Sequence, residues 1–144
     1  MPKIVSRKKI FCPYSNLFEF IWDIKKWSSF WSPLKEVQVL YDDGFHQEFN
    51  LYVSWEGTIA TVRTIRFRDN DGNVSFFSPE PPPPTISHYG KWIFLSQCDG
   101  SIELIAERNF CYPYQDGSDF TERFHNRLKI LLDKIEETCP KLMY

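Results

Sequence analysis

The C-terminal stretch DFTERFHNRLKILLDKIEETC, residues 119–139, decides the fold that the remaining chain must accommodate. Its apolar side chains recur every three or four positions, which places them on one face of an α-helix roughly 30 Å long. We expect Asp119 to cap the start of this helix and Pro140 to end it. The apolar face consists of Phe120, Phe124, Leu128, Leu131, Ile135 and Cys139, with Leu132 at its margin.

The residues before this helix predict mainly β-strands. Runs of alternating apolar and polar side chains, separated by Gly, Asp, Asn and Pro, are typical of strands joined by tight turns. The predicted strands are residues 3–12, 34–41, 46–55, 57–68, 73–78, 86–96 and 102–112. Between the first two strands we expect one short helix after Pro13, then a single turn or a second short helix at residues 27–33. The order predicts an α+β fold, in which a bent antiparallel sheet of about six to seven strands wraps the long C-terminal helix.

The length and the composition favour a single domain, residues 1–144, with a hydrophobic pocket. A chain of 144 residues can bury a substantial core. Five Trp, seven Tyr and thirteen Phe supply large apolar surfaces for the space between the concave sheet and the helix. The net charge is only −2 and the Lys and Arg residues are scattered, so we expect no nucleic-acid partner.

The cysteines and the apolar segments favour a cytoplasmic protein. Cys12, Cys98, Cys111 and Cys139 form no C-x-x-C motif, and the chain starts with no secretory signal, so we expect reduced thiols. The most apolar segment, residues 16–24, is too short and too charged to span a bilayer. We therefore expect no stable membrane insertion.

Two segments are open to more than one interpretation. PEPPPP at residues 79–84 contains P-x-x-P matches typical of ligands of SH3 domains, but its internal position favours a stiff connector between two strands. In residues 57–68, one side carries Ala60, Val62, Thr64 and Arg66, and the other carries Ile59, Ile65 and Phe67 among others. Alternation alone leaves open which side faces inward.

Four short motifs carry a resemblance to a known superfamily. They are FCPYSNLF at residues 11–18, DIKKW at residues 23–27, Thr64-Ile65-Arg66, and Lys91-Trp92 with Asp99-Gly100-Ser101. Together with the order of the elements, they resemble the helix-grip fold of the START and Bet v 1-like (SRPBCC) proteins, and within it the polyketide aromatase/cyclases. The resemblance implies a pocket between the sheet and the C-terminal helix, which holds a poly-β-ketone chain delivered on an acyl carrier protein.

The resemblance also assigns site residues. Arg66 matches the pocket arginine of that family, Thr64 its neighbouring hydroxyl residue and Trp27 its pocket tryptophan, so the Arg66 side of residues 57–68 is expected to face inward. A guanidinium in a dry pocket would stabilise the enolate of an aldol closure, and Thr64 would orient a carbonyl or a water. Leu34 stands where some cyclases have a pocket Tyr, which favours binding over catalysis. The expected ligand-binding residues are Trp27, Trp31, Leu34, Phe49, Leu51, Val62, His88, Trp92, Phe94, Arg108, Phe124 and Leu128.

Other interpretations of these residues stay open. For Arg66, the alternative is a side chain that extends to water or pairs with an acid. For Arg108, the alternative is a salt bridge at the edge of the sheet. His88 is the alternative acid/base residue. No two of the three histidines have metal-ligand spacing, so we expect neither a metal nor a cofactor. A non-catalytic lipid or isoprenoid carrier of the same fold is the second functional hypothesis, and an interaction module that uses residues 79–84 is the third.

Overall fold

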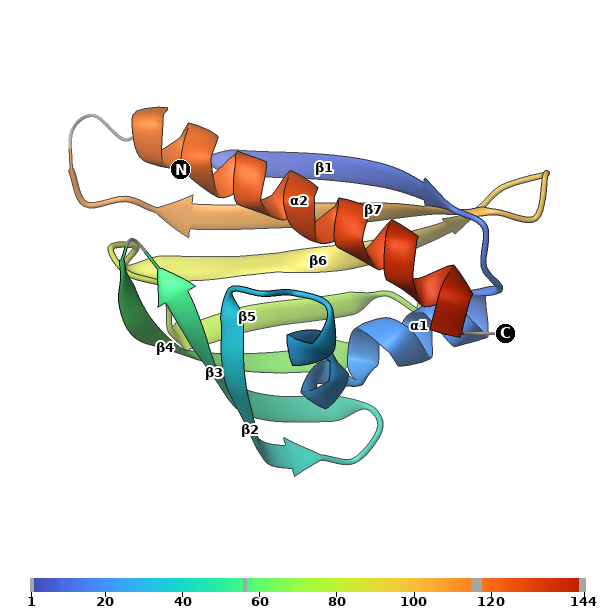
Figure 1. Ribbon diagram of the computed structural model, residues 1–144, viewed down its shortest axis with the longest axis horizontal. Coiled ribbons are helices and arrows are strands. Elements are labelled where there is room, and N and C mark those ends of the chain that lie inside the picture. The colour runs from blue at the N-terminus through green and yellow to red at the C-terminus, as the bar shows by residue number, and fades with distance from the viewer. Residues whose placement is uncertain (1, 56, 115–117, 143–144) are drawn as a thin grey trace.

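The computed structural model describes residues 2–55, 57–114 and 118–142 of the 144-residue chain. In these ranges an antiparallel sheet wraps one long helix (Figure 1). Two short helices follow the first strand, the second of them a 3₁₀ helix, η1. The elements are β1 (Lys3–Ile10), α1 (Tyr14–Trp22), η1 (Ile24–Ser29), β2 (Leu34–Asp42), β3 (His46–Trp55), β4 (Thr58–Arg68), β5 (Val74–Glu80), β6 (Ser87–Ser96), β7 (Ile102–Cys111) and α2 (Ser118–Leu142).

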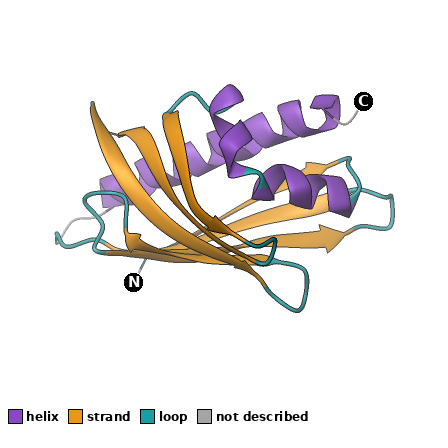
Figure 2. Cartoon of the chain, turned by 90° about the horizontal axis from the view of Figure 1, so that it is seen from below, coloured by secondary structure: helices purple, strands orange, loops and turns teal. Residues whose placement is uncertain are grey.

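The described strands form one seven-stranded sheet in the order β1-β7-β6-β5-β4-β3-β2. Strands β2 to β7 pair consecutively and antiparallel, which confirms the predicted meander. Strand β1 pairs with β7, from Lys3 opposite Asn109 to Ile10 opposite Ile102. The sheet is strongly curved, and both α-helices lie on its concave side (Figure 2). Because a curved sheet cannot contact a straight helix along its whole length, this arrangement leaves room for a cavity.

The apolar face of α2 packs onto the sheet as the spacing predicts. The residues of this face, Phe120, Phe124, Leu128, Leu131, Leu132, Ile135 and Cys139, are buried, whereas Ile130 on another side of the helix is exposed. Both boundary predictions are wrong, however: the helix begins at Ser118, so Asp119 lies in its first turn, and it continues past Pro140 to Leu142. The carboxylate of Asp119 accepts a hydrogen bond from Arg123 one turn later, instead of capping the backbone. A proline this close to a helix end removes only one backbone hydrogen bond, which the helix tolerates.

The concave side of β4 carries the residues that the resemblance implies. Ala60, Val62, Thr64 and Arg66 are buried, whereas Ile59 and Phe67 on the other side are exposed. The strand therefore turns a hydroxyl group and a guanidinium group toward the interior of the domain.

Strand β5 extends to Glu80, two residues beyond its predicted end, and Pro82 beyond it is buried.

At the far end of α2, the sulfur atoms of Cys12 and Cys139 lie 3.6 Å apart as free thiols. Burial raises the pKa of Cys139 to about 12. No helix in the described ranges has the length and hydropathy that a bilayer span requires.

Candidate functional site

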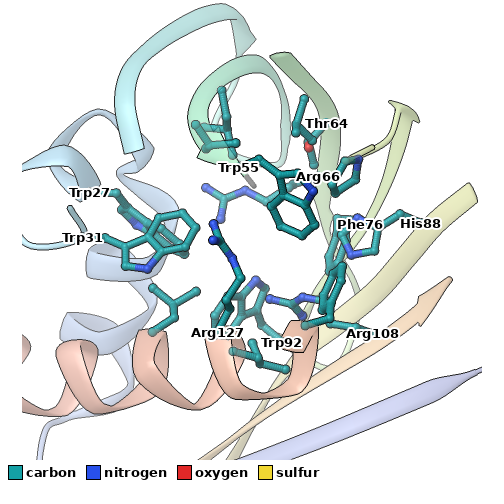
Figure 3. Close-up of a pocket in the computed structure, with 17 residues that line it drawn as sticks. Trp27, Trp31, Trp55, Thr64, Arg66, Phe76, His88, Trp92, Arg108 and Arg127 are labelled. Carbon is teal, nitrogen blue, oxygen red and sulfur yellow. The ribbon is translucent and has the colours of Figure 1, made fainter. Parts of the chain in front are cut away.

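A cavity of about 140 Å³ lies between the concave face of the sheet and α2 (Figure 3). Strands β3 to β7, η1 and α2 all contribute side chains to it. An apolar cavity of about 150 Å³ accommodates a benzene molecule, so this one has the size of a single ring. The lining residues are Trp27, Trp31, Leu51, Val53, Trp55, Val62, Thr64, Arg66, Phe76, Pro82, His88, Trp92, Arg108, Phe124, Arg127, Leu128 and Leu131.

The structure brings most of the predicted site residues together in this lining. They come from elements far apart in the sequence, since η1, β4, β7 and α2 each supply at least one. Their role toward a ligand remains a prediction. The predicted residues that line the cavity are Trp27, Trp31, Leu51, Val62, Thr64, Arg66, His88, Trp92, Arg108, Phe124 and Leu128.

Three predicted residues, Leu34, Phe49 and Phe94, lie outside the lining of this cavity, and their role toward a ligand also remains a prediction. All three are buried. The ring of Phe94 packs against α1, at 5.5 Å from Tyr14 and 5.9 Å from Phe18 between centroids. Alternation along a strand identifies the concave side, but α1 covers one end of that side. Since Leu34 is outside the lining, its identity does not decide between catalysis and binding.

Six lining residues were not predicted as site residues. Val53 and Trp55 share the inner side of β3 with Leu51, so the same alternation indicates them. Leu131 belongs to the apolar stripe of α2. Arg127 lies between two apolar positions of that helix and has no periodic signal of its own. The residues that were missed are Val53, Trp55, Phe76, Pro82, Arg127 and Leu131.

The guanidinium group of Arg66 holds the end of α1 against the sheet. Its Nη1 donates to the carbonyl of Ile21 at 3.0 Å and its Nη2 to that of Trp22 at 2.8 Å. These are the last two residues of α1, whose carbonyls have no partner within the helix. A cation at a helix C-terminus is also favoured by the helix dipole. The hydrogen bonds and the dipole both stabilise the docking of α1, and Nε2 of Gln47 also donates to the Trp22 carbonyl at 3.0 Å.

Gln47 completes the network around Arg66. Its Oε1 accepts hydrogen bonds from Nε of Arg66 at 2.8 Å and from Nη2 at 2.5 Å. Its Nε2 donates to Asp42 at 3.0 Å, and the other oxygen of that carboxylate accepts from the Trp22 indole at 3.1 Å. Burial lowers the pKa of Arg66 to about 9, and the nearby Asp42 charge opposes this shift. Four of the five N–H groups of Arg66 are therefore bonded to protein oxygens.

Arg108, which reaches the cavity from β7, has a different environment. Only 7% of its surface is exposed, and its guanidinium carbon lies 4.7 Å from the ring centre of Phe76 and 4.6 Å from that of Trp92. Its Nη1 donates to the carbonyl of Glu107 at 2.9 Å, and among the described residues no other acceptor bonds to it. Burial alone lowers its pKa to about 9, so the group stays charged at neutral pH.

A chain of polar side chains extends from Thr64 to His88. The Thr64 hydroxyl lies 3.3 Å from that of Ser78, which lies 3.2 Å from Nδ1 of His88. The His88 ring packs between Phe76 and Phe124, and its Nε2 is buried without a hydrogen-bond partner in the described structure. Burial first, and the charge of Arg108 second, lower the pKa of His88 to about 3. The imidazole is therefore neutral at physiological pH.

This neutral histidine makes stability depend on pH in a defined window. The pKa of His88 is about 3 when folded and 6.5 in its ordinary state, so between these values the unfolded chain binds the extra proton. Stability that His88 contributes above pH 6.5 is lost as the pH falls toward 3, by up to about 1.4 kcal/mol per pH unit. We expect His88→Gln to remove this dependence in urea unfolding at pH 7.5, 5.5 and 4.5. Parallel pH profiles for both proteins would contradict the prediction.

The lining provides hydrogen-bond donors and cations in an apolar wall. The indole Nε1 atoms of Trp27 and Trp55 are buried and have no described acceptor. Arg127 lies over the ring of Trp55 at 4.5 Å and donates to the carbonyl of Ser54 at 3.2 Å. None of the described lining residues is Asp or Glu. Such a cavity suits a flat apolar molecule that carries acceptor oxygens.

Comparisons with known proteins agree with this architecture. No family model matches the chain. The granaticin polyketide synthase bifunctional cyclase/dehydratase of Streptomyces violaceoruber is 28% identical over 105 residues, which cover 72% of this chain and 32% of that protein. The chain thus spans about a third of the length of the curated relative it matches.

Solved structures show the same fold. The Zhui aromatase/cyclase from Streptomyces sp. R1128 has a TM-score of 0.80 and 15% identity, with 99% of this chain and 96% of the other covered. A START superfamily protein from Mycobacterium smegmatis has a TM-score of 0.83 and 12% identity, with 97% and 98% covered. A STAR-related lipid transfer protein from Xanthomonas axonopodis has a TM-score of 0.78 and 9% identity, with 96% and 85% covered.

The fold is therefore the helix-grip fold that the START superfamily protein from Mycobacterium smegmatis also has. The sequence match to the cyclase/dehydratase confirms the resemblance to polyketide cyclases, and the Zhui aromatase/cyclase has the same fold.

Proposed function

We propose that the protein binds an aromatic or polyketide-like ligand in the cavity and guides the cyclisation of a poly-β-ketone chain. The observation that carries the proposal is the cavity itself, an aromatic-walled space with buried cations and no described acidic side chain in its lining. The sequence similarity to a bifunctional cyclase/dehydratase supports the cyclisation step. In this proposal an acyl carrier protein delivers the chain to the cavity.

The lining offers what an intramolecular aldol closure requires. Closure passes through an enolate, and Arg108 supplies a buried positive charge that stabilises the developing negative charge on oxygen. The rings of Trp27, Trp31 and Trp92 restrict a flexible chain, so that the reacting carbons meet more often. The volume of about 140 Å³ accepts one ring, so we expect the cavity to enlarge when a longer chain enters.

The direct test is incubation of the protein with a poly-β-ketone chain held on its carrier protein. We expect mass spectrometry of the products to show one cyclised product enriched over the mixture that forms without the protein. A product distribution identical to the spontaneous one would contradict the cyclisation step. A variant that fills the cavity tests the binding step separately.

Filling the cavity is expected to block ligand binding without unfolding the protein. Val62 lines the cavity on β4, so the ring in Val62→Phe would occupy the space that a ligand needs. Thr61→Phe is the matched control, because residue 61 of the same strand is exposed. We expect at least a tenfold weaker affinity for a one-ring aromatic probe with Val62→Phe, and no change with Thr61→Phe, in calorimetric titrations. Equal affinities would place the binding site elsewhere.

A lipid or isoprenoid carrier is the second candidate. The structural likeness to the STAR-related lipid transfer protein from Xanthomonas axonopodis favours it, and so does the mainly apolar lining. Native mass spectrometry of the purified protein, followed by extraction of whatever is bound, separates the two candidates. A bound fatty or isoprenoid chain would select the carrier, and a bound aromatic or polyketide-like molecule would select the first proposal.

A further inference from the structure

Three guanidinium groups line the cavity, and they differ in how the protein satisfies them (Figure 3). Arg66 uses four of its five N–H groups to hold α1 and Gln47, and Asp42 lies next to that network. Arg127 donates to a backbone carbonyl of β3 and lies over the ring of Trp55. Arg108 makes one hydrogen bond, to the carbonyl of the residue before it, and has no described carboxylate partner.

A buried cation without an anion is costly to a fold. Removal of a charge from water is offset only by close opposite charges and several hydrogen bonds, and an apolar side chain of similar size often serves the fold equally well. The rings of Phe76 and Trp92 compensate Arg108 in part through cation–π contacts. The remaining N–H groups of Arg108 have no acceptor among the described residues.

We propose that Arg108 recognises an anionic oxygen, a carboxylate or a phenolate, on a ring-sized apolar ligand. This inference rests on the proposed function, because it assumes that the ligand occupies the same cavity. A guanidinium binds a carboxylate through two parallel hydrogen bonds, and such a pair is strong where water is excluded. The flat rings of Phe76 and Trp92 beside the cation suit the ring of the ligand, and Nε2 of His88 is a further polar group on this wall.

The test uses two probes that share one shape and differ in charge, benzoate and nitrobenzene. Each is titrated into the ¹⁵N-labelled full chain, and the indole N–H signals of Trp27 and Trp55 report on the cavity. The indole of Trp22 donates to Asp42 and serves as an internal reference. We expect benzoate to bind at least tenfold more tightly than nitrobenzene. This preference should fall by about 10- to 100-fold in Arg108→Met and be partly kept in Arg108→Lys.

The outcomes separate this inference from the proposed function. If nitrobenzene binds as tightly as benzoate and Arg108→Met changes neither affinity, the cavity takes aromatic ligands but Arg108 does not recognise an anion. If neither probe binds the wild-type protein, both proposals fail. We expect Arg108→Met to melt at or above the wild-type temperature, because it removes a buried charge that has no described carboxylate partner. Arg108→Gln, which is also uncharged but polar, provides the same comparison if the methionine variant does not fold.

Discussion

Replacement of Arg66 by methionine is expected to lower the free energy of unfolding by about 3–5 kcal/mol, because several buried acceptors lose a charged donor worth roughly 1.5–3 kcal/mol each. Methionine keeps an unbranched apolar side chain but removes every N–H group. The carbonyls of Ile21 and Trp22 then lose hydrogen bonds at a buried helix end, and so does Gln47. Urea unfolding followed by circular dichroism measures the loss. A residual folded state should show weaker docking of α1, which hydrogen exchange of its amides would detect.

Arg63→Met is the matched control on the same strand. Arg63 lies on the convex side, half-exposed, and donates from Nε to Glu48 at 2.5 Å. Exposed ion pairs contribute about 1 kcal/mol or less, so this variant should change stability little. If Arg66→Met costs no more than Arg63→Met, the network around α1 does not stabilise the fold. If Arg66→Met folds normally and loses only cyclisation, Arg66 has the catalytic role that the family resemblance implies.

The sequence contains enough information to predict the layers of this fold. The period of α2 identifies its buried stripe, because a helix that covers a sheet must bury one face. The alternation in β3 and β4 identifies the side chains that point inward, and short turns predict consecutive pairing. For β4 alternation alone was ambiguous, and the family resemblance chose the side of Thr64 and Arg66, which the structure shows to be buried.

The helix and strand periodicities could not predict which part of the concave face lines the cavity. Phe49 and Trp55 share the inner side of β3, yet Trp55 faces the cavity and Phe49 packs 5.1 Å from the guanidinium of Arg66. The difference depends on where α1 covers the sheet, which is a tertiary contact. The partners of Arg66 have the same origin, because strand pairing places Asp42 of β2 opposite Gln47 of β3, and Gln47 opposite Arg66 of β4. Local patterns contain no signal for such contacts.

Gly90→Ala is expected to cost roughly 3 kcal/mol or more, because the new methyl group has no space. Gly90 lies on the concave side of β6, paired with Phe76 of β5 and with Arg108 of β7. A Cβ atom there would lie 2.0 Å from the carbonyl oxygen of Glu107 and 3.1 Å from the ring of Phe76. The first contact is with backbone, so β7 itself must shift. Urea unfolding measures the loss.

The same substitution should also disturb the anion site. The carbonyl of Glu107 is the acceptor for Arg108, so its displacement moves the guanidinium, and Phe76 packs on that group. For the fraction of the Gly90→Ala variant that remains folded, we expect a weaker affinity for benzoate and little change in the affinity for nitrobenzene. Gly44→Ala is the control: its φ of 86° strains an alanine, but no atom lies within 4 Å of the new Cβ, so the cost should be about 1–2 kcal/mol. If both variants cost the same, close packing at Gly90 does not position Arg108.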